Sequence, residues 1–433
     1  MPTRLPITAS AIVWGVLTIA VPLFGANKEK LLYNFPSNSG GFEPEASLIF
    51  DKAGNLYGTT YSGGAYECGY DFGCGTIFEL TPDGNGQWTE TMLHDFTGGE
   101  DSCSPLANLI FDAAGNLYGT ASGAGDVDGP CNNGTVFELS PGQNGTWTFK
   151  VLYGFSNRDG AFPEGLVFDA AGNLYGITEG GGPSDGGTVF ELSQGENGTW
   201  TEKVLNFFSY QGQFGFNPVG GLVLDKAGNL YGITCCGGVY GNTCGPSYFG
   251  CGVVFELTPE DNGEWTERVV HNFNYTDGDN AAAGLISDAA GNLYGTTQWG
   301  GVFGYGIVFE LSAGANGNWT ERVLHSFSLY HEDGTTPAGQ LIFDTAGNLY
   351  GTTSFGGSFG SQCGNSYNCG TVFELTPGVK TVTWTERVLH RFNGTDGAFP
   401  LAGLIFDSEG NLYGDTMEGG SYGSGAVFEI VRR

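Results

Sequence analysis

The residues with the clearest potential for chemistry are side chains that depart from a repeated pattern. An apolar run recurs seven times along the chain and can be aligned on one leucine in each copy: Leu48, Leu109, Leu166, Leu222, Leu285, Leu341 and Leu404. The residue before that leucine is glycine in four copies, and the exceptions are Ser47, Asn108 and Gln340. One position earlier the residues are small except for Glu164. A lone carboxylate in such a place is suited to general acid catalysis or to binding a cation.

Asp415 also departs from its repeat, because the other copies carry threonine or isoleucine at its position and no partner for it is evident. Most other polar residues recur. Four of the five histidines fall at one position, His94, His271, His325 and His390, and only His331 lies outside it. An aspartate that ends the apolar run, such as Asp51, and the glutamate of Phe-Glu-Leu, such as Glu79, return in nearly every copy. Such recurrence favours hydrogen bonding in turns and strands over catalysis.

The variable segments between the repeated motifs are acidic and aromatic, and Arg158 is their clearest basic residue. Aromatic rings offer flat apolar surfaces and carboxylates accept hydrogen bonds from hydroxyls, a combination suited to sugars. The structural alternative is that acidity keeps the protein soluble while the rings pack the loops. We predict a binding set at one mouth of the fold, formed by Ser47, Asn108, Glu164, Gln340, Trp299, Tyr305, Tyr61 and Arg158.

Composition excludes several classes of protein. The 433 residues include 77 glycines, well above the usual share of roughly 7%, but the glycines follow no collagen-like period. A hydrophobic content of 40% with 14% aromatics is enough for a packed core and excludes a disordered chain. Fifteen Lys and Arg residues against 46 Asp and Glu residues give a net charge of −31, so binding of nucleic acid is not expected.

The beginning of the chain and the cysteines both indicate export. Residues 1–26 contain Arg4 and a mostly apolar run over residues 11–23, which is typical of a secretory signal peptide. We therefore predict a secreted, periplasmic or extracellular protein with no membrane span in its mature chain. Three cysteine pairs precede a Gly-x-x-Phe-Glu-Leu segment at matching places: Cys68/Cys74, Cys244/Cys251 and Cys363/Cys369. This recurrence favours local disulfides over metal ligation. We place the remaining cysteines in the disulfide set as well and leave their connectivity open: Cys103, Cys131, Cys235 and Cys236.

The repeat itself predicts the fold. Gly-Asn-Leu-Tyr-Gly begins at Gly54, Gly115, Gly172, Gly228, Gly291, Gly347 and Gly410. Each unit contains four short β-rich runs separated by turn residues, so we predict an all-β, seven-bladed β-propeller of four-stranded blades over residues 27–433. The last unit lacks its fourth strand, and residues 29–35 match that missing strand in pattern. We expect this N-terminal strand to join the last blade and close the ring, which also removes an exposed edge.

The repeated units resemble the tandem-repeat family called GloVer, which occurs in exported bacterial proteins. The match covers nearly the whole predicted mature chain and is carried by the Gly-Asn-Leu-Tyr-Gly and Val-Phe-Glu-Leu motifs. The resemblance implies an extracellular repeat protein. It implies no agreed activity and no set of catalytic residues.

Three functions remain open. The favoured one is a non-catalytic, monomeric module that binds a polysaccharide or an extracellular protein. The alternative is a carbohydrate-active enzyme, a glycoside hydrolase or a polysaccharide lyase, in which Glu164 acts with a second carboxylate of a neighbouring loop. A retaining glycosidase would need the two carboxyls about 5–5.5 Å apart and an inverting one about 6.5–9.5 Å. The third is a scaffold for protein partners. No cofactor is predicted, although Asp-Gly loops such as residues 276–279 leave Ca²⁺ open.

Overall fold

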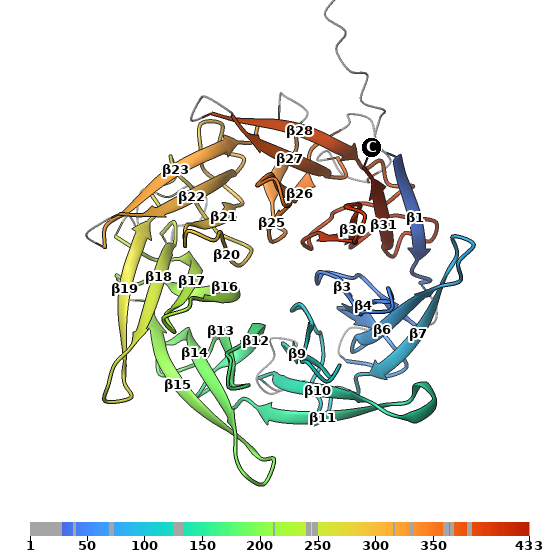
Figure 1. Ribbon diagram of the computed structural model, residues 1–433, viewed down its shortest axis with the longest axis horizontal. Coiled ribbons are helices and arrows are strands. Elements are labelled where there is room, and N and C mark those ends of the chain that lie inside the picture. The colour runs from blue at the N-terminus through green and yellow to red at the C-terminus, as the bar shows by residue number, and fades with distance from the viewer. Residues whose placement is uncertain are drawn as a thin grey trace, which may run out of the picture.

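Seven antiparallel sheets stand around a central axis in the computed structural model, as Figure 1 shows. The structure describes residues 28–37, 40–68, 73–123, 133–210, 213–239, 244, 250–314, 317–329, 333–357, 363, 368–378 and 383–432. Each sheet forms one blade, with its first strand nearest the axis and its fourth strand outermost. The predicted seven-bladed propeller is therefore confirmed. The predicted signal peptide lies outside the described residues.

The first three blades follow one another along the chain. Blade 1 contains β3 (Ile49–Phe50), β4 (Leu56–Thr60), β6 (Thr76–Pro82) and β7 (Trp88–Asp95). Blade 2 contains β8 (Ile110–Phe111), β9 (Leu117–Ala121), β10 (Thr135–Pro141) and β11 (Trp147–Gly154). Blade 3 contains β12 (Ala161–Phe168), β13 (Leu174–Gly180), β14 (Asp185–Gln194) and β15 (Trp200–Ser209). A short pair, β2 (Gly41–Phe42) with β5 (Ser62–Gly63), and a 3₁₀ turn at Gln143–Gly145 complete this half.

The remaining blades complete the ring. Blade 4 contains β16 (Phe216–Leu224), β17 (Leu230–Cys236), β18 (Val253–Pro259) and β19 (Trp265–Asn272). Blade 5 contains β20 (Ile286–Ser287), β21 (Leu293–Thr297), β22 (Ile307–Ala313) and β23 (Trp319–Ser326). Blade 6 contains β24 (Thr335–Pro337), β25 (Ile342–Phe343), β26 (Leu349–Phe355), β27 (Thr371–Pro377) and β28 (Trp384–Arg391). Blade 7 contains β29 (Ile405–Phe406), β30 (Leu412–Thr416), β31 (Ala426–Val431) and β1 (Lys28–Asn34).

The two ends of the chain close the ring in the last blade. β1 pairs antiparallel with β31 from Lys28↔Val431 to Asn34↔Ala426, and Figure 1 shows the blue and red strands side by side. Phe35 follows β1 and is completely buried between blades 7 and 1, against Phe78, Leu48 and Val427. The prediction that the N-terminal strand completes the last blade is therefore confirmed.

The recurring aspartates and glutamates form hydrogen bonds within each blade. In blade 1, Asp51 Oδ1 accepts hydrogen bonds from the backbone N–H groups of Ala53 and Asn55, while Asn55 Nδ2 donates to Asp51 Oδ2. Gly54 completes this turn at φ +90°, where a side chain would be strained. The Tyr57 hydroxyl donates to Glu79 Oε1 at 2.9 Å. These residue types are therefore occupied in turns and strand contacts, in agreement with the structural interpretation of their recurrence.

The recurring histidines lie on the outermost strands, at the boundaries between blades. Each Nε2 faces an aspartate of the loop that follows, at 3.1 Å for His94–Asp101 and 3.2 Å for His390–Asp396. Each ring also contacts the edge of a phenylalanine two residues further along. Their role in the fold is structural, as their position in the repeat suggested. His331 lies outside the described residues.

The cysteines follow the prediction in part. Disulfides join Cys68 to Cys74, Cys244 to Cys251 and Cys363 to Cys369. Cys103 is also disulfide-bonded, while Cys131 lies outside the described residues. The expectation that Cys235 and Cys236 form part of the disulfide set is wrong in this structure, because both are free thiols. They are consecutive residues of β17, where side chains alternate, and they pack against the cores on opposite sides of blade 4.

Candidate functional site

One face of the propeller carries the variable loops, which join the second strand of a blade to the third and the fourth strand to the next blade. We call this the upper face. Exposed rings are concentrated there: Tyr66, Tyr210, Phe214, Phe303 and Tyr422 are 44–61% exposed. Trp299, Tyr305 and Tyr61 are only half-buried rather than open, so the exposed rings are largely different ones from those we expected. Large rings that project from a loop face are available to a partner.

The first strands surround a central cavity of about 390 Å³. Ser47, Asn108, Glu164 and Gln340 all line it, so the structure brings these four sequence-selected residues together. Three of them are engaged in contacts between blades. Asn108 Oδ1 accepts from the Ser47 N–H at 2.7 Å, Ser47 Oγ accepts from the Gly403 N–H at 2.9 Å, and Gln340 Nε2 donates to the Leu285 carbonyl at 3.1 Å. Their present role is to join neighbouring first strands.

Glu164 differs from these three because the pKa of its carboxyl group is raised. Oε2 accepts a hydrogen bond from the backbone N–H of Gly220 in the next blade, while the rest of the side chain faces the central cavity. Desolvation raises the pKa of Glu164 to about 8, and the negative charge of Glu179 adds to this effect. A carboxyl with this pKa is largely protonated at neutral pH, so it can donate as well as accept hydrogen bonds.

Glu164 also lines a second cavity, of about 380 Å³, on the upper face, formed by residues of blades 1 to 4. We call it the lateral groove and define it by its principal side chains: Tyr61, Leu106, Ser122, Phe162, Glu164, Glu179, Asp185, Tyr210 and Asn217. Three aromatic rings and three carboxyls therefore surround one hollow, which has the size of a small-ligand site. Tyr61 is the only predicted aromatic that lines this groove. Trp299, Tyr305 and Arg158 do not line either cavity.

The predicted binding set did not include Glu179, Asp185, Phe162, Tyr210 or Asn217. For Glu179 a signal was present, because it follows Thr178 at a position where the other blades carry tyrosine, serine, cysteine, glutamine or methionine. It is the only carboxylate at that position, just as Glu164 is at its own. Burial raises the pKa of Glu179 as well. Asp185 and Tyr210 had no such signal, because their loops differ in length between blades. Phe162 and Asn217 occupy a position that recurs in every blade, but the residue type at this position varies too much for either to stand out.

The backbone that leads into the groove is a scaffold feature and gives no sign of function by itself. Phe162 and Asn217 have positive φ angles of 60° and 52°. Each of the other five blades has a non-glycine residue in the same state before its first strand: Glu43, Ser104, Asn280, Thr336 and Phe399. Because the conformation recurs in all seven blades, it belongs to the fold.

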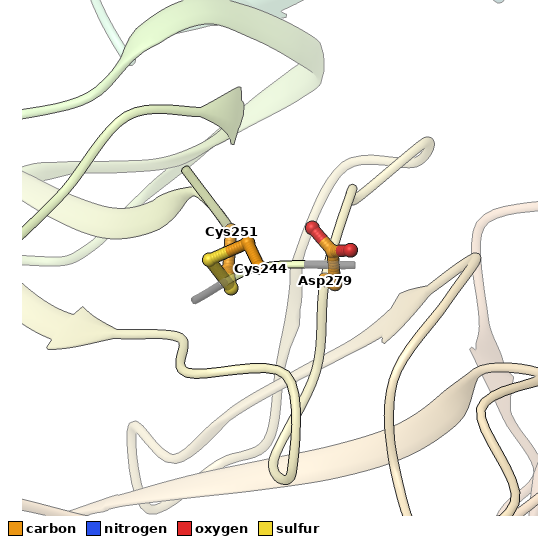
Figure 2. A group of neighbouring side chains, drawn as sticks. All are labelled: Cys244, Cys251 and Asp279. Carbon is orange, nitrogen blue, oxygen red and sulfur yellow. A yellow bond between two sulfur atoms is a disulfide. The ribbon is translucent and has the colours of Figure 1, made fainter. Parts of the chain in front are cut away.

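A cluster of potential metal ligands lies beside blade 4, and its chemistry argues against a metal centre. One atom each of Cys244, Cys251 and Asp279 lie within 4.8 Å of one another. Figure 2 shows the two sulfur atoms joined to each other, with the Asp279 carboxylate to one side. Sulfur in a disulfide has no thiolate to offer a metal, so these three residues do not form a thiolate site. Asp277, in the loop where Ca²⁺ was left open, accepts hydrogen bonds from Asn274.

Comparison with known proteins gives a family and a fold. The sequence profile of the Gloeobacter/Verrucomicrobia repeat matches residues 19–245 and 236–433. No curated protein matches the sequence. The fold is similar to that of a fungal alcohol oxidase of the AA5 family in complex with copper, with 13% identity and a TM-score of 0.57 over 94% of this chain and 76% of that chain. It is also similar to a protein of unknown function from Dyadobacter fermentans, with 11% identity and a TM-score of 0.46 over 95% and 100% of the two chains. The likeness to the alcohol oxidase, at 13% identity, establishes the fold alone. Among the described residues, no helix is long and apolar enough to cross a membrane.

Proposed function

The chain belongs to the Gloeobacter/Verrucomicrobia repeat family, and from that premise we propose that it is an exported binding module that recognises a glycan through the lateral groove. The disulfides are consistent with export, since such bonds persist in oxidising compartments. The repeat supplies a rigid ring, and the variable loops of the upper face supply the ligand contacts.

One observation carries this proposal: the lateral groove combines rings with carboxyls. Tyr61, Phe162 and Tyr210 offer flat apolar surfaces on which the C–H face of a sugar can stack. Asp185 and Glu179 accept hydrogen bonds from sugar hydroxyls, and the Asn217 side chain can both donate and accept. Because the groove contains no described lysine or arginine, a neutral sugar fits it better than an anionic one.

Native electrophoresis through gels that contain different polysaccharides tests the proposal. We expect retarded migration, with the polymer intact, on at least one neutral polysaccharide. Tyr210→Ala should weaken this retardation about ten-fold or more, because Tyr210 is the most open ring of the groove and truncation of an aromatic contact in a binding site commonly costs more than 1 kcal/mol. Tyr66→Ala is the matched control, since Tyr66 and Tyr210 are both 49% exposed but Tyr66 does not line the groove. Equal losses in both variants, or no retardation of the wild type on any gel, would count against the lateral groove.

A second candidate function is favoured by the pairing of Glu164 with Glu179 in the same groove. A glycoside hydrolase needs a carboxyl that stays protonated near neutral pH, and the pKa of Glu164 is raised to about 8. Glu179 would then be the second carboxylate that such an enzyme requires. This function predicts cleared zones in the gels in place of retardation.

Glu164→Gln separates the two functions. Glutamine keeps an acceptor for the Gly220 N–H, so the fold should be unchanged. If the protein only binds, this variant should retain wild-type retardation within about three-fold. If the protein is an enzyme, clearing should fall by two orders of magnitude or more, as is typical when a general acid is removed. Gel retardation measures the binding outcome, and release of reducing sugar from the polysaccharide measures the cleavage outcome. Absence of any glycan effect would favour a scaffold for protein partners.

A further inference from the structure

One position of the repeat links each blade to the next. It follows Gly-Asn-Leu-Tyr-Gly and carries Thr59, Thr120, Thr296 and Thr352 in four blades, isoleucine in two, and Asp415 in the last. In three blades the threonine hydroxyl donates to a backbone carbonyl of the following blade. The bonds are Thr59 Oγ1 to Pro105 O at 3.1 Å, Thr120 Oγ1 to Glu164 O at 3.3 Å and Thr352 Oγ1 to Ala402 O at 3.0 Å. In these three blades, the residue at this position therefore donates a hydrogen bond across the boundary to the next blade.

Asp415 occupies this position at the boundary between blades 7 and 1. It is 1% exposed, and neither of its carboxylate oxygens has a hydrogen-bond partner. The surrounding backbone repeats that of blade 1. A Cβ on Gly425 would lie 2.7 Å from Pro44 Cδ, as one on Gly75 would lie 2.6 Å from Pro105 Cδ. Thr59 donates to the carbonyl four residues before the aligned leucine, whereas Thr120 and Thr352 donate to the carbonyl two residues before it. By this register, Asp415 faces a backbone carbonyl of residues 44–46. Two acceptors then face each other, and a proton or a cation must lie between them.

A second carboxyl stands next to this pair. Glu45 follows Pro44 and lines the central cavity, so solvent and ions can reach it. The segment is fixed against blade 7 by the Glu43 N–H, which donates to the Ser424 carbonyl at 3.1 Å. Burial raises the pKa of Asp415 and of Glu45, the latter to about 7, and the charge of Glu45 further raises the pKa of Asp415. Among the described residues, neither carboxyl forms an ion pair with a lysine, arginine or histidine, so their negative charge is uncompensated within the chain.

We propose that the boundary between the last and first blades binds one Ca²⁺ ion, through the carboxylates of Asp415 and Glu45 and a backbone carbonyl of residues 44–46. Carboxylate and carbonyl oxygens are the ligands that Ca²⁺ prefers, and water from the central cavity can complete its six to eight ligands. Mg²⁺ fits less well, because it demands a near-ideal octahedron and gives up its water reluctantly. Few protein charges contribute, so the affinity should lie in the range of extracellular modules, about 10⁻⁴–10⁻³ M. The ion would join blade 7 to blade 1, where three other boundaries use a threonine hydroxyl.

Thermal unfolding of the purified protein tests the proposal. At pH 7.5, about 10 mM Ca²⁺ should raise Tm by about 3 °C over EDTA, whereas equal Mg²⁺ should raise it by less than about 1 °C. Equilibrium dialysis should find one Ca²⁺ per chain with this affinity. No shift in Tm together with no bound Ca²⁺ would overturn the proposal and indicate that a proton occupies the boundary.

Two variants keep the test decisive. Asp415→Thr restores the residue that four other blades carry, so the variant should fold, and its Tm should no longer respond to Ca²⁺. Asp185→Asn removes an exposed carboxylate of the lateral groove instead and should leave the Ca²⁺ response intact. A wild-type response in Asp415→Thr would refute the site, as would loss of the response in Asp185→Asn. Glycan retardation should be unchanged in Asp415→Thr, so this outcome does not depend on the proposed function.

Discussion

Phe35→Ala is expected to lower the free energy of unfolding by about 3–5 kcal/mol, the usual cost of deleting a fully buried phenylalanine side chain. The Phe35 ring is completely buried and meets Phe78 of blade 1 at a centroid distance of 5.2 Å. Its backbone N–H donates to the Gly425 carbonyl of blade 7 at 3.0 Å. Phe35 therefore contacts both blades that meet at the ring closure. Denaturant unfolding followed by tryptophan fluorescence measures the loss.

An equivalent residue in the middle of the chain provides the control. Phe96 follows β7 as Phe35 follows β1, and it is also completely buried. Phe96→Ala should cost a similar amount, but only Phe35→Ala should let β1 detach, because no turn joins β1 to its partner strand β31, whereas a turn joins β7 to β6. Limited proteolysis should therefore cut Phe35→Ala near residue 36 under native conditions and leave Phe96→Ala intact there. Resistance of both variants to cleavage would mean that β1 is held by more than this closure.

The ring closure and the blades could be predicted from the sequence because the seven copies of the repeat can be aligned with one another. Seven copies of one motif define which runs are strands, and a missing fourth strand in the last copy identifies its replacement near residue 30. The glycine of Asn-Leu-Tyr-Gly illustrates why the motif is so regular. A Cβ on Gly58 would lie 2.6 Å from Phe78 Cζ and 2.9 Å from Leu48 Cδ2, so the packing excludes any other residue.

The site could be predicted only where a residue broke the pattern. Glu164 and Asp415 stood out for this reason, and Glu179 could have been found in the same way. Tyr210 could not, since its loop differs in length between blades, and Asn217 could not, since the residue type at its position varies from blade to blade. Only the folded ring brings them to Tyr61. Exposure of a ring was equally beyond the sequence: Trp299 and Tyr305 are half-buried, whereas Phe214 and Tyr422 are exposed.

The blade boundaries hold a further set of carboxyls, on the outermost strands. Glu90, Glu202, Glu267, Glu321 and Glu386 share one position of the Trp-Thr-Glu segment, and Glu29 is its counterpart in β1. In all six, Oε1 is buried and has no hydrogen-bond partner. Burial raises the pKa of every one of them, to about 7 for four: Glu202, Glu267, Glu321 and Glu386. We call these four the boundary glutamates.

The groups that face the boundary glutamates have opposing effects. The negative charges of Asp159, Asp277 and Asp333 raise the pKa values of Glu202, Glu321 and Glu386. His271 lowers the pKa of Glu321, His325 and Arg391 lower that of Glu386, and the Asn206 amide lowers that of Glu267. Burial is the largest cause in each case, so the folded protein holds these protons more tightly than the unfolded chain does.

Stability should therefore fall as pH rises from about 4.5 to about 7 and beyond. Between the unfolded pKa of 4.5 and the folded value of about 7, the native state binds more protons than the unfolded state, so the stabilisation is complete below pH 4.5 and is lost as pH passes 7. After allowance for partial exposure, each group contributes about 1 kcal/mol, so the four together give about 4 kcal/mol between pH 5 and pH 8. Denaturant unfolding at fixed ionic strength across this range measures the slope.

Glu→Gln at all four boundary glutamates should remove most of this slope and make the protein more stable than the wild type at pH 8, because a neutral amide replaces a buried charge. The control variant changes four exposed carboxylates, Glu67, Glu100, Glu196 and Glu264, to glutamine. It alters the net charge by the same amount and should keep the wild-type slope. If both variants flatten the pH profile equally, the repulsion within a chain of net charge −31 is the cause and the boundary glutamates are not. If only the boundary variant does, the acid stability of the ring comes from the carboxyls between its blades.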